Sequence, residues 1–173
     1  MEIGVQRRVR SLDLRGNDAV APMSFEEFFL EEHDRLYRAL FFITGSSHEA
    51  DDLAQEAFAK LWERWDRIDR IDDPTAYLFR IALNGFRTRL RRAKVASRHV
   101  LPVAQEPQDP FKEIELREDV RRMLVSLPTR QRAALVLTEI IGYDSAQAGA
   151  ILGIRAATVR ALASQGRAAL RAP

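Results

Sequence analysis

The sequence has no cysteine, and its three histidines are far apart. Disulfides and thiolate metal sites are therefore excluded, and His33, His48 and His99 lack the spacing of a metal-binding motif, so we expect no metal and no cofactor. No apolar run reaches the roughly 18 residues of a membrane-spanning helix, and the N-terminus lacks the apolar segment of a secretion signal. These absences favour a cytoplasmic globular protein.

The composition leaves the number of domains open. The 173 residues, of which 46% are hydrophobic, could form one domain or two small ones. The formal net charge is only +2, but the pI of about 9.3 reflects an excess of arginine. The charges are grouped by segment, so their distribution says more about partners than their sum does.

The first segment is expected to be a flexible leader over residues 1–23, which contains four arginines and few large apolar residues. Ser24 and Glu27 then form a capping-box pattern that predicts the start of a helix. This helix should end at Thr44–Gly45, where glycine follows the last apolar residues.

The stretch from His48 to Trp65 predicts an amphipathic helix that begins at Ser46 or Ser47. Its apolar face consists of Ala50, Leu53, Ala54, Ala57, Phe58, Leu61, Trp62 and Trp65. Its opposite face, called here the acidic ridge, consists of Asp51, Asp52, Gln55, Glu56 and Glu63. Acids in a first turn can simply complement the helix dipole. Alternatively, such a ridge would suit docking onto a basic surface.

A third helix is predicted from Pro74 to about Arg92, with Asp73 as its cap. Between residues 80 and 98 there are seven basic residues and no acid. A solvated basic face is the ordinary explanation of such a run, but an aromatic and an amide side chain share this face with the arginines. We therefore favour contact with a nucleic-acid backbone and unstacked bases. The residues of this face are Tyr77, Arg80, Asn84, Arg87 and Arg91.

Residues 97–115 are predicted to be a linker, because they lose helical periodicity and contain three prolines. The linker also carries the acids Glu106, Asp109, Glu113 and Glu115. We thus expect an all-α fold of two small helical modules, over residues 24–96 and 116–173, joined by a flexible linker.

The second module contains the sequence pattern of a helix-turn-helix. Gly142 should end one helix, Ser145 should cap a short helix, and Gly153 should turn the chain into the last helix. Val159, Leu162, Ala163, Gly166 and Leu170 are expected to face inward there, and Arg160, Ser164, Gln165, Arg167 and Arg171 outward. Such a face could bind phosphates and base edges, although similar hairpins also occur in proteins that never bind DNA.

Taken together, the segments resemble the extracytoplasmic-function (ECF) sigma factors, small initiation factors of bacterial RNA polymerase. The resemblance covers residues 24–171, and its most specific runs are SSHEADDLAQEAFAKLWERW, DDPTAYLFRIALNGFRTRLRR, LVSLPTRQRAALVLTEIIGY and AILGIRAATVRALASQGRAALR. It implies two helical modules, known as region two and region four, and no catalytic residues. The implied function is to direct core polymerase to promoters and to assist promoter opening. Promoter DNA, core polymerase and an anti-sigma factor are the implied partners.

The resemblance also implies roles for individual residues. The surface that grips the coiled coil of the largest polymerase subunit would contain Asp51, Asp52, Leu53, Gln55, Glu56 and Phe58. The start-proximal promoter element would be contacted by Tyr77, Arg80, Asn84, Arg87 and Arg91. The upstream element would be read by Arg155, Thr158, Arg160, Ser164, Gln165 and Arg167. The acidic linker would thread through the basic cleft of the polymerase; a simple tether is the other interpretation.

Three departures from the family pattern lie in the second module. This chain has Ala148–Gly149 in place of the usual Ile-Ala, Arg155 in place of a serine cap, and Leu162 in place of an arginine. Glycine inside a helix costs about 0.5–1 kcal/mol relative to alanine, which predicts a module of marginal stability. Two other classes of protein fit the pattern less well: a helix-turn-helix regulator with a dimerisation or sensing domain, and an all-helical adaptor.

Overall fold

The computed structural model describes residues 23–96 and 114–171, and all regular structure within these two ranges is helical. The elements of the first range, the N-terminal module, are α1 (Phe25–Thr44), α2 (Ser47–Trp62), η1 (Trp65–Arg70) and α3 (Pro74–Ala96). The elements of the second range, the C-terminal module, are α4 (Ile114–Val125), α5 (Thr129–Leu135), η2 (Val136–Ile140), α6 (Ser145–Leu152) and α7 (Ala156–Arg171). The predicted leader and most of the predicted linker lie outside the described residues. The all-α, two-module prediction is confirmed.

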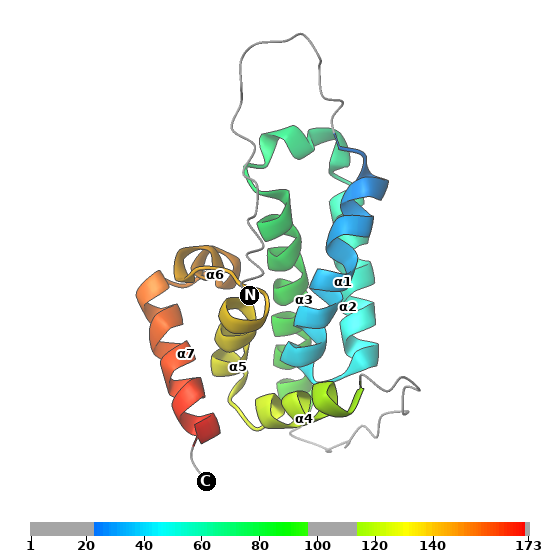
Figure 1. Cartoon of the computed structure of the whole chain (residues 1–173). Coiled ribbons are helices and arrows are strands. Elements are labelled where there is room, and N and C mark those ends of the chain that lie inside the picture. The colour runs from blue at the N-terminus through cyan, green and yellow to red at the C-terminus, as the bar shows by residue number, and fades with distance from the viewer. Residues whose placement is uncertain (1–22, 97–113, 172–173) are drawn as a thin grey trace, which may run out of the picture.

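Local side-chain chemistry explains where the helices of the N-terminal module begin and end. Ser24 and Glu27 form the predicted capping box, and Gly45 ends α1 with φ of 80° in the left-handed region. Ser46, one of the two predicted caps, accepts a hydrogen bond from the backbone of Glu49. Asp73 accepts one from the backbone of Ala76 at the start of α3. These short-range patterns fix α1, α2 and α3, which stand side by side (Figure 1).

The end of α2 differs from the prediction, which extended the apolar face through Trp62 and Trp65. The helix ends at Trp62, whose residue surface is 56% exposed, and Trp65 lies in the separate 3-10 element η1. The ring of Phe25 packs against both indoles, with its centroid 4.8 Å from that of Trp62 and 5.2 Å from that of Trp65. Both tryptophans therefore pack on Phe25, although α2 does not extend by another turn to include Trp65.

In the C-terminal module, one predicted cap was wrong by a residue. Asp144, rather than Ser145, caps α6, because its carboxylate accepts hydrogen bonds from the backbone of Ala146 and Gln147 and the Gln147 side chain completes a capping box. The predicted glycines are confirmed, since Gly142 and Gly153 both adopt positive φ after helices. The hydroxyl of Ser145 instead accepts a hydrogen bond from Arg160 of α7.

The structure explains why glycine occupies position 149, which could not be predicted from the sequence. A Cβ atom at this position would lie 2.7 Å from the carbonyl oxygen of Ile154 and 3.3 Å from the nitrogen of Ala156. Both atoms are backbone, so neither can swing away. Glycine therefore allows α6 to approach the turn into α7, and the family departure at this position is not simply a loss of helix propensity.

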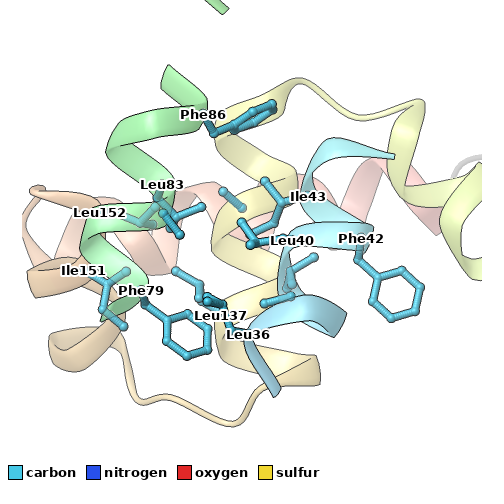
Figure 2. Close-up of a cluster of buried hydrophobic side chains, with 14 of the residues drawn as sticks. Leu36, Leu40, Phe42, Ile43, Phe79, Leu83, Phe86, Leu137, Ile151 and Leu152 are labelled. Carbon is cyan, nitrogen blue, oxygen red and sulfur yellow. The ribbon is translucent and has the colours of Figure 1, made fainter. Parts of the chain in front are cut away.

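The two modules share one hydrophobic core. Helix α6 packs on α3, while α4 and α5 pack on α1 (Figure 1). Figure 2 shows Leu137, Ile151 and Leu152 of the C-terminal module among side chains of α1 and α3. Their partners in that cluster include Leu36, Leu40, Ile43, Phe79 and Leu83. The modules are thus closed against each other.

Candidate functional site

The acidic ridge of α2 lies on the outside of the N-terminal module. Asp51, Gln55, Glu56 and Glu63 are exposed, and the Asp52 side chain is 45% exposed. Leu53 and Phe58, which were predicted to join the same polymerase-binding surface, are buried in the core at 1% and 4% exposure. The structure therefore separates this set into an exposed polar ridge and two apolar residues that hold the helix beneath it.

Arg89 connects α3 to the acidic ridge of α2. Its guanidinium forms ion pairs with Asp52, at 3.7 Å, and with Glu56. The prediction had counted Arg89 only as part of the basic run. Its position in the helix could have revealed the difference, because residues 84, 87 and 91 lie three or four apart on one face and 89 does not.

Glu49, in the first turn of α2, is partly buried and lies near both positive and negative charges. Burial raises the pKa of this carboxyl, Arg89 and Arg132 lower it, and Asp52 raises it. Arg132 belongs to α5 of the other module and is 7% exposed. Burial lowers the pKa of its guanidinium, and the Glu49 carboxylate opposes that shift. Glu49 and Arg132 thus influence each other's pKa although they belong to different modules.

The predicted basic face of α3 is exposed over part of its length only. Arg80, Asn84 and Arg91 are exposed, and the Tyr77 hydroxyl accepts a hydrogen bond from Arg64. Arg87 is different, because it donates a hydrogen bond to the carbonyl of Leu152 in the C-terminal module and one of 3.4 Å to the Asn84 side chain. Burial lowers the pKa of the Arg87 guanidinium, and the nearby Arg130 and Arg91 lower it further.

A groove of about 1000 Å³ lies between the C-terminal half of α3 and the C-terminal module. One wall is α3, and the other is formed by the start of α5 and the turn between α6 and α7. Apolar side chains and the cations Arg87, Arg91, Lys94 and Arg130 line it. Part of the predicted promoter-binding face is thus a wall of an inter-module groove.

The last helix presents the polar face that the sequence predicted. Arg155, Arg160, Ser164, Gln165 and Arg167 are exposed and Thr158 is half-buried, while Val159, Ala163 and Gly166 are buried. Leu162 and Leu170, also predicted inward, are partly buried against the core. Arg167 pairs with Glu139 of η2, and Arg160 donates to Ser145 at 3.1 Å. Both arginines are therefore held in position over the exposed face.

Within residues 23–96 and 114–171, no group of three or more metal-ligating side chains comes together. Across those same ranges, none of the helices is both long enough and apolar enough to span a membrane.

The fold and the exposed surfaces define a two-module helical protein whose second module is a helix-turn-helix. Family models for sigma-70 region 2 and sigma-70 region 4 match residues 28–95 and 117–170. The chain is 32% identical over 167 residues to the ECF RNA polymerase sigma factor SigE of Mycolicibacterium smegmatis, a match over 92% of this chain and 64% of that protein. It is 30% identical over 147 residues to SigM of Mycobacterium tuberculosis, over 85% of this chain and 75% of that protein.

A solved structure agrees at the level of the fold. The sigma factor RpoE of Bartonella quintana, crystallised with the anti-sigma factor NepR, superposes with a TM-score of 0.71 at 24% identity, over 85% of this chain and 94% of that one. The chain belongs to the ECF family of RNA polymerase sigma factors, which act in transcription initiation. Sigma factors as a class are not enzymes.

Proposed function

We propose that this sigma factor binds core polymerase through the acidic ridge of α2 and directs it to specific promoters through α3 and α7. The observation that supports this most strongly is the pair of oppositely charged surfaces on the N-terminal module. The ridge is acidic and exposed, and α3 exposes arginines on a neighbouring face. An acidic surface fits a basic protein partner, and a basic surface with an aromatic and an amide fits DNA.

The proposed division of labour follows from the two kinds of DNA-binding surface. Tyr77, Arg80, Asn84, Arg87 and Arg91 would contact the start-proximal element, where the duplex opens. Unstacking a base costs a few kcal/mol, which contacts to the extruded base and the backbone must offset. The exposed face of α7 would read the upstream element as duplex, with Arg155, Thr158, Arg160, Ser164, Gln165 and Arg167 as the contact residues. The reaction chemistry belongs to the polymerase.

Two further parts of the proposal concern the cellular location of the protein and its regulation. The chain would act in the cytoplasm, where the polymerase works, and an anti-sigma factor would restrain it. The anti-sigma factor in the RpoE complex supports this second point by analogy of fold.

The test is a gel-shift comparison on promoter DNA selected with the holoenzyme. The factor alone should bind this DNA weakly, and the factor with core polymerase should bind it strongly and specifically. Strong, specific duplex binding without core would instead support the helix-turn-helix regulator, for which the exposed face of α7 would suffice. Binding to neither core nor DNA would support the adaptor.

A further inference from the structure

One arginine is paired with the acidic ridge that we propose as the polymerase-binding surface. The Arg89 guanidinium, on α3, lies 3.7 Å from the Asp52 carboxylate and donates a hydrogen bond to the Glu56 carboxylate. Asp52 and Glu56 are one turn apart on α2, so a single guanidinium bridges both. All three side chains remain partly exposed, at 30% for Arg89, 45% for Asp52 and 50% for Glu56. A partner that approaches the ridge therefore meets ion pairs at these positions and not two free carboxylates.

The packing of α3 on α2 explains how Arg89 reaches the ridge. Gly85 lies one turn before Arg89 on the same face of α3. A Cβ built on Gly85 would lie 3.2 Å from Cδ2 of Leu53 and 4.0 Å from Oε2 of Glu56. Because Gly85 has no side chain, the α3 backbone approaches α2 closely here. The Arg89 side chain, one turn further on, can then contact both carboxylates.

Two other titratable groups of α2 lie next to these ion pairs. Glu49 is one turn before Asp52; burial raises the pKa of its carboxyl, and the Arg89 guanidinium lowers it. Nδ1 of His48 is 3.8 Å from Asp52, but the His48 side chain is 85% exposed, so water and salt screen any charge it carries. Arg89 thus acts on three carboxylates on successive turns of α2.

These contacts oppose the docking of a basic surface in two ways. A basic group of the polymerase must displace the Arg89 guanidinium from Asp52 and Glu56 or share the carboxylates with it, and an intramolecular partner competes at high effective concentration. The positive charge of Arg89 also reduces the attraction that steers a basic partner toward the ridge. Holding the carboxylates in one orientation would favour binding, but partly exposed ion pairs order their side chains only weakly. The loss of attraction therefore dominates.

We infer that Arg89 is an internal competitor for the acidic ridge: it occupies Asp52 and Glu56 in the free protein and keeps the affinity for core polymerase below the value that the ridge alone would give. This inference rests on the proposed function of the ridge. Arg89 acts through the two carboxylates and does not need to touch the polymerase itself. It gives α3 an influence on polymerase binding that is separate from its proposed contacts with DNA.

The test is the dissociation constant for core polymerase, measured by fluorescence anisotropy. The chain has no native cysteine, so Ala168→Cys at an exposed position of α7 carries the label in every protein. Arg89→Gln removes the internal cation and should lower the Kd about two- to fivefold, the range expected for one partly exposed ion pair. Because the effect is electrostatic, the gain should shrink as the salt concentration rises.

Three matched variants accompany Arg89→Gln. Arg89→Met, which keeps the apolar stem, should give the same gain and provides the result if Arg89→Gln does not fold. Arg89→Lys keeps the positive charge and should recover most of the wild-type Kd. Arg38→Gln makes the same change in net charge at an exposed position of α1 and should leave the Kd unchanged. A folded Arg89→Gln or Arg89→Met protein that binds no more tightly than the wild type would overturn the inference, as would Arg89→Lys binding as tightly as Arg89→Gln.

A double-mutant cycle distinguishes failure of this inference from failure of the proposed function. In an Asp52→Asn/Glu56→Gln background the ion pairs are already absent, so Arg89→Gln should have little further effect on the Kd. An equal gain in both backgrounds would mean that Arg89 acts without the ridge, which refutes the inference alone. If Asp52→Asn/Glu56→Gln itself leaves the Kd at the wild-type value, the ridge is not the docking surface, and the proposed function of α2 is refuted whatever Arg89 does.

Discussion

At the scale of single residues, Gly149 shows how a tertiary contact can override helix propensity. The sequence favours alanine at this position, because glycine in a helix interior costs about 1 kcal/mol. In the structure, however, a Cβ would press against two backbone atoms of the turn into α7, the nearer at 2.7 Å. The close approach decides whether alanine stabilises or destabilises the protein here, since the turn cannot widen without moving α7.

We therefore expect Gly149→Ala to destabilise the protein by about 1–3 kcal/mol, as overpacking does elsewhere. Urea unfolding followed by far-UV circular dichroism measures the change. Ala150→Gly, at the exposed neighbouring position, serves as the control for propensity alone and should cost about 1 kcal/mol. A stabilised Gly149→Ala protein would show that the turn relaxes freely.

Glu49 provides a prediction of pH dependence. Its pKa is raised above the ordinary value of 4.5, mainly by burial, with Arg89, Asp52 and Arg132 as the nearby charges. The folded state therefore binds this proton at a higher pH than the unfolded state does. The stabilising contribution is present below pH 4.5 and is lost as pH rises through the folded pKa.

Glu49→Gln should remove this contribution, because glutamine stays neutral at every pH. The free energy of unfolding of the variant, minus that of the wild type, should increase as pH rises from 4.5 and reach its plateau above the folded pKa. Urea titrations at a series of pH values give this difference. A difference that falls over the same range would mean that the two arginines outweigh burial.

At the scale of elements, the sequence predicted helices best where the determining contacts are local. The capping box of Ser24 and the turn at Gly153 depend on neighbours in the chain, and both are confirmed. One error arose because two adjacent residues, Asp144 and Ser145, could each cap the same helix. Another arose because the apolar spacing continues beyond Trp62, where α2 ends and the aromatic side chains pack on another helix instead. Arg89 was counted only as a member of the basic run, and its pairing was not predicted because its partners Asp52 and Glu56 are on another helix.

The acidic ridge gives the first prediction at this scale. Asp52→Lys/Glu56→Lys should abolish binding to core polymerase, because like charges facing each other across an interface cost several kcal/mol, more than about tenfold in Kd. The variant also places two lysines beside Arg89. Pull-down with core polymerase measures binding, and circular dichroism checks the helical content.

Glu26→Lys/Glu31→Lys is the matched control, since it makes the same change in net charge at exposed positions of α1. This control should bind core as the wild type does. A ridge variant that is folded and still co-purifies with core at wild-type yield would remove α2 from the docking surface.

The two proposed DNA-binding elements can be distinguished on a promoter that is opened in advance. Arg80→Ala and Asn84→Ala on α3 should impair strand opening, so an artificial mismatch near the start site should partly rescue them. Arg160→Ala and Arg167→Ala on α7 should impair duplex recognition and should not be rescued. Permanganate footprinting of the open region provides the measurement, and equal rescue of all four variants would contradict the division of labour.

At the scale of the whole molecule, the sequence predicted two modules but not how they pack. Leu36, Leu83, Leu137 and Ile151 belong to apolar patterns that fit the interior of either module alone. Periodicity identifies which face is buried, but it does not name the partner element. The same ambiguity explains why Arg87 was predicted to be a free DNA contact, whereas in the structure it donates to Leu152.

A common core predicts that the two modules unfold together. Both tryptophans of the chain, Trp62 and Trp65, lie in the N-terminal module, so their fluorescence reports on that module, whereas far-UV circular dichroism reports on all helices. Leu137 lies in the C-terminal module, fully buried in the shared cluster (Figure 2). Leu137→Ala should cost about 2–5 kcal/mol, the usual range for a leucine removed from a core.

If the two modules unfold as one unit, the lost free energy of unfolding affects both of them. The fluorescence midpoint in urea should then fall by as much as the circular dichroism midpoint, although the substitution lies in the module without tryptophan. Met123→Ala, at a position 49% exposed on α4, should move neither midpoint appreciably. Coincident transitions are the ordinary signature of a single cooperative unit. A Leu137→Ala protein whose fluorescence transition stays in place while its circular dichroism transition shifts would show that the modules fold independently and that their contact is too weak to couple them.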